Sequence, residues 1–316
     1  MSTHRVVIGL ISYNDKQYLE KTLPLLTDLP SSHIVLLDNA SNDDIKTFIK
    51  KSFPSITYIR HPEGNVGFSK GHNYILKKAP ASKYYLCLNT DIKLEKEGYA
   101  QCVQALEEDS NIAMVSGKLY HWDSTSDTKT TIIDTLGIIG SCGHHFWDRG
   151  QGKKDVGQYD DTLNVIFGIS GAAFFIRRSV IHALHGEDHL LFDEHIFMYK
   201  DDVDLAYRMR WQQMKITLLP VVLGYHARTL GKKKKKSLFE AKNSYKNHWI
   251  MLRSNVDRGF RIRTKLAIIM YELLKFLYYL VRKPKVLSVL PEVWRMNVSK
   301  SKRTISPRRM EHYFLS

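Results

Sequence analysis

The sequence predicts an α/β fold in which a mainly parallel sheet is flanked by helices. In the first hundred residues, short apolar runs alternate with amphipathic segments, which is the order of strands and crossover helices in a parallel sheet. A further apolar run and a second acidic cluster follow before residue 210. The chain has 316 residues, 43% of them hydrophobic, which is enough for a continuous core.

Four apolar runs are expected to form the parallel strands. We predict strands at 6–12, 33–38, 56–59 and 84–89, and helices near 16–28, 43–52 and 68–79. Ligands of such sheets bind beyond the carboxyl ends of the strands. The polar residues at those ends are therefore candidates for a binding site: Ser12, Tyr13, Asn14, Asp38, Asn39, Asn89 and Asp91.

The segment from about 117 to 165 has weak periodicity, and we predict loops and short strands there. Residues 165–178 are expected to form an apolar strand with a glycine-rich bend. Asp201, Asp202 and Asp204 then form the densest acidic group, and His226 follows another apolar run. Like charges this close together indicate a bound cation or catalysis. The alternative is structural, because carboxylates favour the first turn of a helix and a single histidine is commonly a hydrogen-bonded core residue.

The net charge of +15 is concentrated near the C-terminus. Residues 228–316 hold 23 Lys or Arg and 5 Asp or Glu, a net of +18, whereas residues 1–227 have a net charge of −3. A long helix is predicted between 265 and 282, with polar side chains on one stripe and apolar ones elsewhere. Its uncharged runs are too short to span a bilayer, so we expect it to lie on an anionic membrane surface. Packing on the catalytic domain or in a homo-oligomer is the alternative.

Several other classes of protein are disfavoured. Neither a Gly-x-Gly-x-x-Gly motif after the first strand nor a Gly-Lys-Ser/Thr loop is present, which argues against dehydrogenases and P-loop enzymes. The three cysteines, Cys87, Cys102 and Cys142, have no paired spacing and indicate neither disulfides nor a zinc site. The N-terminal residues lack the pattern of a secretory signal, so we expect a cytoplasmic protein.

Seven sequence blocks together carry a resemblance to a known family. They are VVIGLISYNDKQYLEKTLPLL, IVLLDNASND, GNVGFSKGHN, YYLCLNTDI, GISGAAFFIRRSVI, FDEHIFMYKDDVDLAYRMR and GYHARTLG. In this order they resemble glycosyltransferase family 2, and most of all its rhamnosyltransferase-like members. The resemblance implies a GT-A fold, which is Rossmann-like, and an inverting single displacement. It also implies a catalytic domain at 1–230, with a nucleotide-sugar half to about 117 and an acceptor half after it, followed by a basic helical extension at 231–316.

Carried onto this chain, the family pattern implies a role for each matching residue. Asp202 is the expected catalytic base, Asp201 replaces the usual glutamate before it, and Asn89-Thr90-Asp91 matches the Asp-x-Asp metal motif in part. Asp91 and His226 are the expected ligands of a divalent cation, Mn²⁺ or Mg²⁺. The nucleotide-sugar donor would contact the remaining positions: Ser12, Tyr13, Asn14, Asp38, Asn65, Gly67, Asn73, Asn89 and Asp91.

The expected reaction is transfer of a sugar from a nucleotide-diphosphate donor to a saccharide acceptor, in the synthesis of a cell-surface polysaccharide. By resemblance, dTDP-L-rhamnose is the first candidate donor. The acceptor is expected to be linked to polyprenyl diphosphate, with the enzyme on the cytoplasmic face of the plasma membrane and no nucleic acid bound. Two alternatives remain: a nucleotidyltransferase or sugar-nucleotide pyrophosphorylase, and a non-enzymatic protein that binds lipid or nucleic acid through the basic tail.

Overall fold

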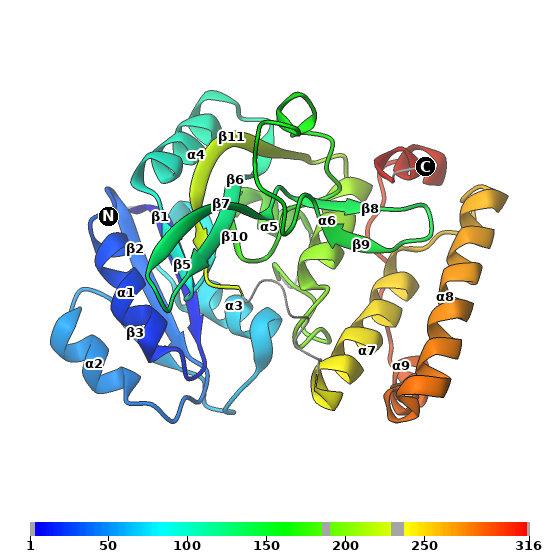
Figure 1. Ribbon diagram of the computed structural model, residues 1–316, viewed down its shortest axis with the longest axis horizontal. Coiled ribbons are helices and arrows are strands. Elements are labelled where there is room, and N and C mark those ends of the chain that lie inside the picture. The colour runs from blue at the N-terminus through cyan, green and yellow to red at the C-terminus, as the bar shows by residue number, and fades with distance from the viewer. Residues whose placement is uncertain (1–3, 185–189, 229–236, 315–316) are drawn as a thin grey trace.

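The computed structural model describes residues 4–184, 190–228 and 237–314. Within them, nine strands form one curled sheet in the order β3-β2-β1-β4-β10-β6-β11-β5, with β7 paired to β6, and β8 pairs with β9 separately. Helices cover both faces of the sheet, and the C-terminal helices stand together on one side of the molecule (Figure 1).

The N-terminal strands and helices confirm the predicted alternation. Pairing of β1 with β2 and β4, and of β2 with β3, is parallel throughout. The elements are β1 (His4–Ser12), α1 (Lys16–Thr27), β2 (Ser32–Asp38), α2 (Ile45–Ser52), β3 (Thr57–Arg60), α3 (Gly67–Lys78), β4 (Ser82–Asn89), β5 (Ile92–Leu94) and α4 (Lys96–Glu108).

The middle of the chain contributes more to the sheet than its sequence indicated. The elements are β6 (Ile112–Asp123), β7 (Thr128–Thr135), β8 (Ile138–Gly140), β9 (Phe146–Asp148), the 3-10 helix η1 (Asp160–Thr162), β10 (Ala173–Arg177), α5 (Arg178–Leu184), α6 (Asp201–Trp211) and β11 (Lys215–His226). The prediction of loops and short strands is wrong for β6, a strand of 12 residues. Both faces of β6 are buried, so no alternation of polar and apolar residues marks it, and its Lys118 is paired with Asp155 and Asp160.

Two apolar cores lie on the two faces of the sheet. Leucines of α1, isoleucines of α2 and Tyr99, Cys102 and Leu106 of α4 pack on one face. Ile75 of α3, residues of α5 and Leu205 and Met209 of α6 pack on the other. This three-layer arrangement leaves the carboxyl ends of β1, β2 and β4 at one edge, as the sequence predicted.

The basic C-terminal extension is helical and packs on the catalytic part. Its elements are α7 (Leu238–Asn255), α8 (Ile262–Arg282), η3 (Pro284–Val289), α9 (Leu290–Arg295), α10 (Pro307–Met310) and η4 (Glu311–Tyr313). Met251, Phe260 and Phe314 share a core with Tyr207 and Trp211 of α6. Among the described helices, none has the length and apolar character needed to cross a membrane. The predicted lysine run at 232–236 lies outside the described residues.

Candidate active site

A cleft with a volume of ≈ 1590 Å³ opens at the carboxyl ends of the strands. Its walls include the ends of β1 and β4, the start of α3, the segment 197–203 that leads into α6, and the helices α7 and α8. The hairpin of β8 and β9 closes one side. The cleft therefore joins the predicted donor half to the C-terminal extension.

Seven of the predicted site residues line this cleft. They are Tyr13, Asn65, Gly67, Asn89, Asp91, Asp201 and Asp202. Gly67 is required by the backbone, because its φ is +77° and a Cβ there would lie 2.2 Å from the carbonyl oxygen of Phe197. Asn39, which the sequence placed at a strand end without a role, also lines the cleft and donates to Asn65 Oδ1 at 2.8 Å.

The other predicted donor contacts do not line the cleft, and they bond to the protein itself. Asp38 is 1% exposed and accepts from Ser41 N, Tyr58 OH and Arg60 at 2.7–2.8 Å. Asn73 accepts from the backbone of Leu191 and Phe192 and so anchors the segment before α6. Ser12 and Asn14 join the first two loops: the Ser12 carbonyl accepts from Asn39 N, and Asn14 Oδ1 from Asn42 N.

His226 stands at the end of β11 between two carboxylates. Its Nε2 is 3.2 Å from Asp91 Oδ1, and its Nδ1 is 2.8 Å from Asp134 Oδ2 on β7. Burial opposes the charged imidazolium, but Asp91 and Asp134 outweigh it and raise the pKa of His226 to about 10. Burial alone would raise the pKa of Asp91, yet the nearby charge of His226 lowers it overall.

The pair Asp91 and His226 fits a divalent cation that takes its other ligands from a substrate. An oxygen and a nitrogen 3.2 Å apart can both contact one ion, and Mg²⁺ is commonly held by one or two protein groups together with substrate phosphates. Asp134, accepting from Nδ1–H, would fix Nε2 as the nitrogen that exchanges its proton for the metal. Within the described part of the chain, no cluster of three or more His, Cys, Asp or Glu could hold a metal ion by itself.

Asp134 and Arg228 are the functional candidates that sequence reasoning missed. Asp134 is 0% exposed, and its Oδ1 lies 3.5 Å from Arg228 Nε. Arg228 lines the cleft and also contacts Asp148 Oδ2 at 2.8 Å, which places a cation beside Asp91. No motif marked Asp134, since it lies in the weakly periodic middle segment. Arg228 belongs to the block GYHARTLG, which also contains His226 and could have indicated it.

Asp201 and Asp202 begin α6 and face the cleft. Asp202 accepts from the backbone N–H groups of Gly171 at 3.1 Å and Val203 at 2.8 Å. Burial, followed by the charge of Asp202, raises the pKa of Asp201 to about 8, and burial also raises the pKa of Asp202. Tyr199 and Lys200 precede them with φ of +68° and +70°, a conformation that side chains disfavour and that the surrounding contacts must hold.

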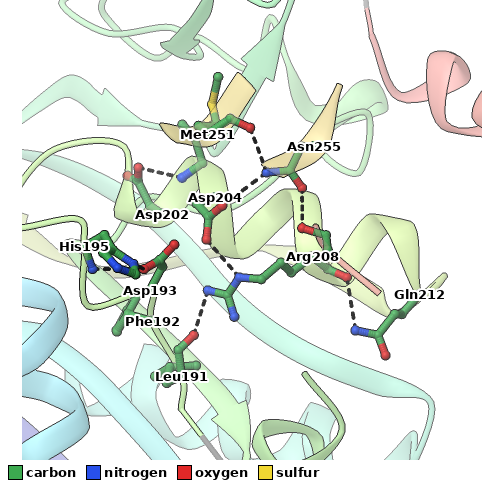
Figure 2. Close-up of polar contacts among 12 residues, drawn as sticks. Leu191, Phe192, Asp193, His195, Asp202, Asp204, Arg208, Gln212, Met251 and Asn255 are labelled. Atoms are coloured by element: carbon green, nitrogen blue, oxygen red, sulfur yellow. Dashed lines mark hydrogen bonds and ion pairs between the residues drawn. The ribbon is translucent and has the colours of Figure 1, made fainter. Parts of the chain in front are cut away.

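Asp204, unlike Asp201 and Asp202, does not line the cleft, and Figure 2 shows its contacts with Arg208 and Asn255. Its Oδ2 accepts from Arg208 Nε at 2.8 Å and its Oδ1 from Asn255 Nδ2 at 3.1 Å. Arg208 in turn donates to the carbonyl of Leu191. Asp204 therefore ties α6 to α7 and to the segment before α6, which is a structural role.

The C-terminal helices complete the wall opposite the strands. Asn247 of α7 donates to the carbonyls of Met198 and Tyr199 and supports the turn before Asp201. His248 of α7 contacts Glu272 of α8 at 2.5 Å, and Lys275 lies over the rings of Tyr245 and Tyr271. Of these residues, His248, Tyr271 and Lys275 line the cleft. The extension thus forms part of the cleft wall.

Comparison with known proteins identifies relatives over most of the chain. The hexosyltransferase Agl10 of low-salt glycan biosynthesis in Haloferax volcanii is 19% identical over 96% of this chain and 93% of its own. A mannosyltransferase of Pyrobaculum calidifontis, solved with GDP-Man and Mn²⁺, superposes with a TM-score of 0.54 at 13% identity, covering 92% of this chain and 74% of its own. GalNAc-T7, solved with UDP, GalNAc and Mn²⁺, gives 0.62 at 15% identity over 95% of this chain and 55% of its own.

These similarities confirm the GT-A fold expected from the sequence. The model of the family described as glycosyl transferase family 2 matches residues 7–184, more than half of the chain. That span contains most of β1, all of β2 to β4, the Asn89-Thr90-Asp91 turn and Asp134. The chain belongs to glycosyltransferase family 2.

Proposed function

We propose that this chain is a metal-dependent, inverting glycosyltransferase that moves one sugar from a nucleotide-diphosphate donor to a hydroxyl of a saccharide acceptor. The first candidate donor is dTDP-L-rhamnose, and the acceptor is a polyprenyl-diphosphate-linked saccharide of a cell-surface polysaccharide. The reaction takes place at the cytoplasmic face of the plasma membrane. The observation that carries the proposal is one cleft lined by both Asp91, backed by His226, and the buried carboxylate of Asp202.

Asp202 is the proposed catalytic base. Burial raises the pKa of both carboxyl groups, that of Asp201 to about 8, and we assign the negative charge of the pair to Asp202 because its carboxylate accepts two backbone hydrogen bonds. Two backbone N–H groups hold that carboxylate in place. As the acceptor oxygen bonds to the anomeric carbon, Asp202 takes the hydroxyl proton, and the bond from that carbon to the diphosphate oxygen breaks with its electron pair. Attack opposite the leaving group inverts the anomeric centre.

The leaving diphosphate is proposed to lie near Asp91, His226 and Arg228. A bound divalent ion supplies Lewis-acid stabilisation of the charge on the departing nucleoside diphosphate. The Mn²⁺ complexes of the Pyrobaculum enzyme and of GalNAc-T7 support this assignment. Arg228 adds a fixed positive charge, and Asp134 holds the ring of His226 in position. Tyr13, Asn65 and Asn89 are the proposed contacts of the donor itself.

A panel of purified nucleotide sugars tests the proposed donor. We would measure nucleoside diphosphate released from dTDP-L-rhamnose, GDP-mannose, UDP-GlcNAc and UDP-galactofuranose with Mn²⁺ or Mg²⁺ present. The fastest release is expected from dTDP-L-rhamnose. Faster release from another donor would replace rhamnose while leaving the reaction class intact. If folded protein released diphosphate from none of a wider panel, with or without extracted lipid-linked acceptors, the proposed reaction would be wrong.

A further inference from the structure

The outer face of α8 is apolar and exposed. Every exposed residue of this helix from Leu266 to Val281 is uncharged. The large side chains at its centre are between 45% and 62% exposed: Leu266, Ile269, Met270, Leu273, Leu274 and Leu277. Helix α8 stands at the edge of the molecule, with α7 on its inner side (Figure 1). A surface helix of a soluble domain normally has the opposite arrangement.

The polar side of α8 faces the protein, and its contacts hold the helix in that orientation. Glu272 is 8% exposed and bonds to His248 of α7. Thr264 and Ile268 are also buried, and Lys275 and Tyr279 line the active-site cleft. Rolling the helix to cover its leucines would break the Glu272 contact and take Lys275 out of the cleft. The apolar face therefore remains exposed to solvent as long as Lys275 and Tyr279 line the cleft.

Positive charges flank this face at both ends. Arg258 and Arg263 are exposed near the start of α8, and Arg282 and Lys285 are exposed at and beyond its end. A second copy packed on the face, whether parallel or antiparallel, would bring these cations against the equivalent cations of the first. An anionic bilayer instead offers acyl chains to the leucines and phosphate groups to the cations. A helix of 21 residues is about 30 Å long, enough to lie along such a surface over several turns.

We propose that the outer face of α8 inserts into the headgroup region of an anionic membrane with the helix in the membrane plane. The inner face of the same helix then presents Tyr271, Lys275 and Tyr279 to an acceptor that arrives from that membrane. The membrane contact does not depend on the proposed reaction. Only the statement that an acceptor arrives from the membrane rests on that reaction.

Sedimentation with lipid vesicles tests the membrane contact. The full chain would be mixed with vesicles of phosphatidylcholine alone or with about 30% phosphatidylglycerol. The double variant Leu273→Glu/Leu277→Glu changes the outer face without touching the cleft. Val156→Glu/Val165→Glu is the matched control, because those valines are 75% and 58% exposed on other segments and the change in charge is the same.

We expect the parent and the control to bind the anionic vesicles and the α8 variant to bind them at least about tenfold more weakly. Equal binding of all three, or no binding by the parent, would overturn the proposal. A parent that is dimeric by light scattering, becomes monomeric in the α8 variant and ignores vesicles would assign the face to a second copy. Circular dichroism checks folding, and donor hydrolysis is measured in parallel. If the parent, the control and the α8 variant all failed to hydrolyse a donor while their vesicle binding followed the expected pattern, the proposed reaction would be refuted and the membrane contact would stand.

Discussion

Replacing Asp134 by Asn should weaken metal binding without removing a metal ligand. Asp134 is fully buried, and its carboxylate accepts from His226 Nδ1 at 2.8 Å, which leaves Nε2, the nitrogen that faces Asp91, to give up its proton when a metal binds. An amide of the same shape can donate to Nδ1 instead, which moves the ring proton to Nε2 and blocks the metal. Loss of such a supporting contact typically costs about 10–100-fold in metal affinity, or about 1.4–2.7 kcal/mol.

Electron paramagnetic resonance of free Mn²⁺ measures this affinity without turnover, in the presence of a nucleoside diphosphate. Asp148→Asn is the control, because Asp148 also bonds to Arg228 and carries the same charge but does not contact His226. We expect Asp134→Asn to raise the dissociation constant for Mn²⁺ at least about tenfold and Asp148→Asn to change it much less. Equal effects of the two variants, or unchanged affinity in Asp134→Asn, would refute the positioning role.

Four further outcomes are expected. Asp202→Asn should abolish transfer while titration calorimetry shows donor affinity within a few-fold of the parent, and retained turnover would exclude Asp202 as the base. Because burial raises the pKa of Asp202 and the base must be ionised, kcat should fall on acidification at a higher pH than an ordinary carboxylate gives; a pH profile flat down to pH 4 contradicts this. Asp204→Ala should lower the free energy of unfolding by about 3–5 kcal/mol in urea, since Arg208 is left buried without its carboxylate, and an unchanged midpoint would remove its structural role. EDTA should stop transfer and Mn²⁺ or Mg²⁺ restore it; full activity after chelation would reject Asp91 and His226 as ligands.

The first half of the fold was predictable because local sequence and tertiary structure agree there. The strands at 6–12, 33–38 and 84–89 are buried on both faces and bounded by polar turns, so apolar runs alone locate them. Strand β6 was not predicted because its buried residues include Ser116 and Lys118, whose polar groups find partners only in the folded chain. Periodicity carries no information about such distant partners.

Sequence could locate the cleft residues that lie next to the ends of strands and helices. It could not locate residues such as Asp134 that act by bonding to another side chain. Asp91, Asp201 and Asp202 line the cleft, because Asp91 lies in the turn after β4 and the other two lie in the first turn of α6. Asp38 also ends a strand, yet Tyr58 and Arg60 of the neighbouring β3 occupy its carboxylate. Contact of Asp38 with the nucleotide base stays a prediction, since a donor would have to compete with those two groups.

The helical spacing of α8 could not decide which of its faces packs on the protein and which is exposed. The spacing predicted a helix with one polar stripe and a broad apolar face, and left open which of them meets the protein. In the structure the polar stripe meets the protein, and its Lys275 and Tyr279 form part of the cleft wall. His248 fixes the stripe through Glu272, and the leucines on the other side are consequently directed outward. The same contacts that hold α8 in the cleft wall thus leave its apolar face exposed, so a change that turned the leucines inward would also take Lys275 and Tyr279 out of the cleft.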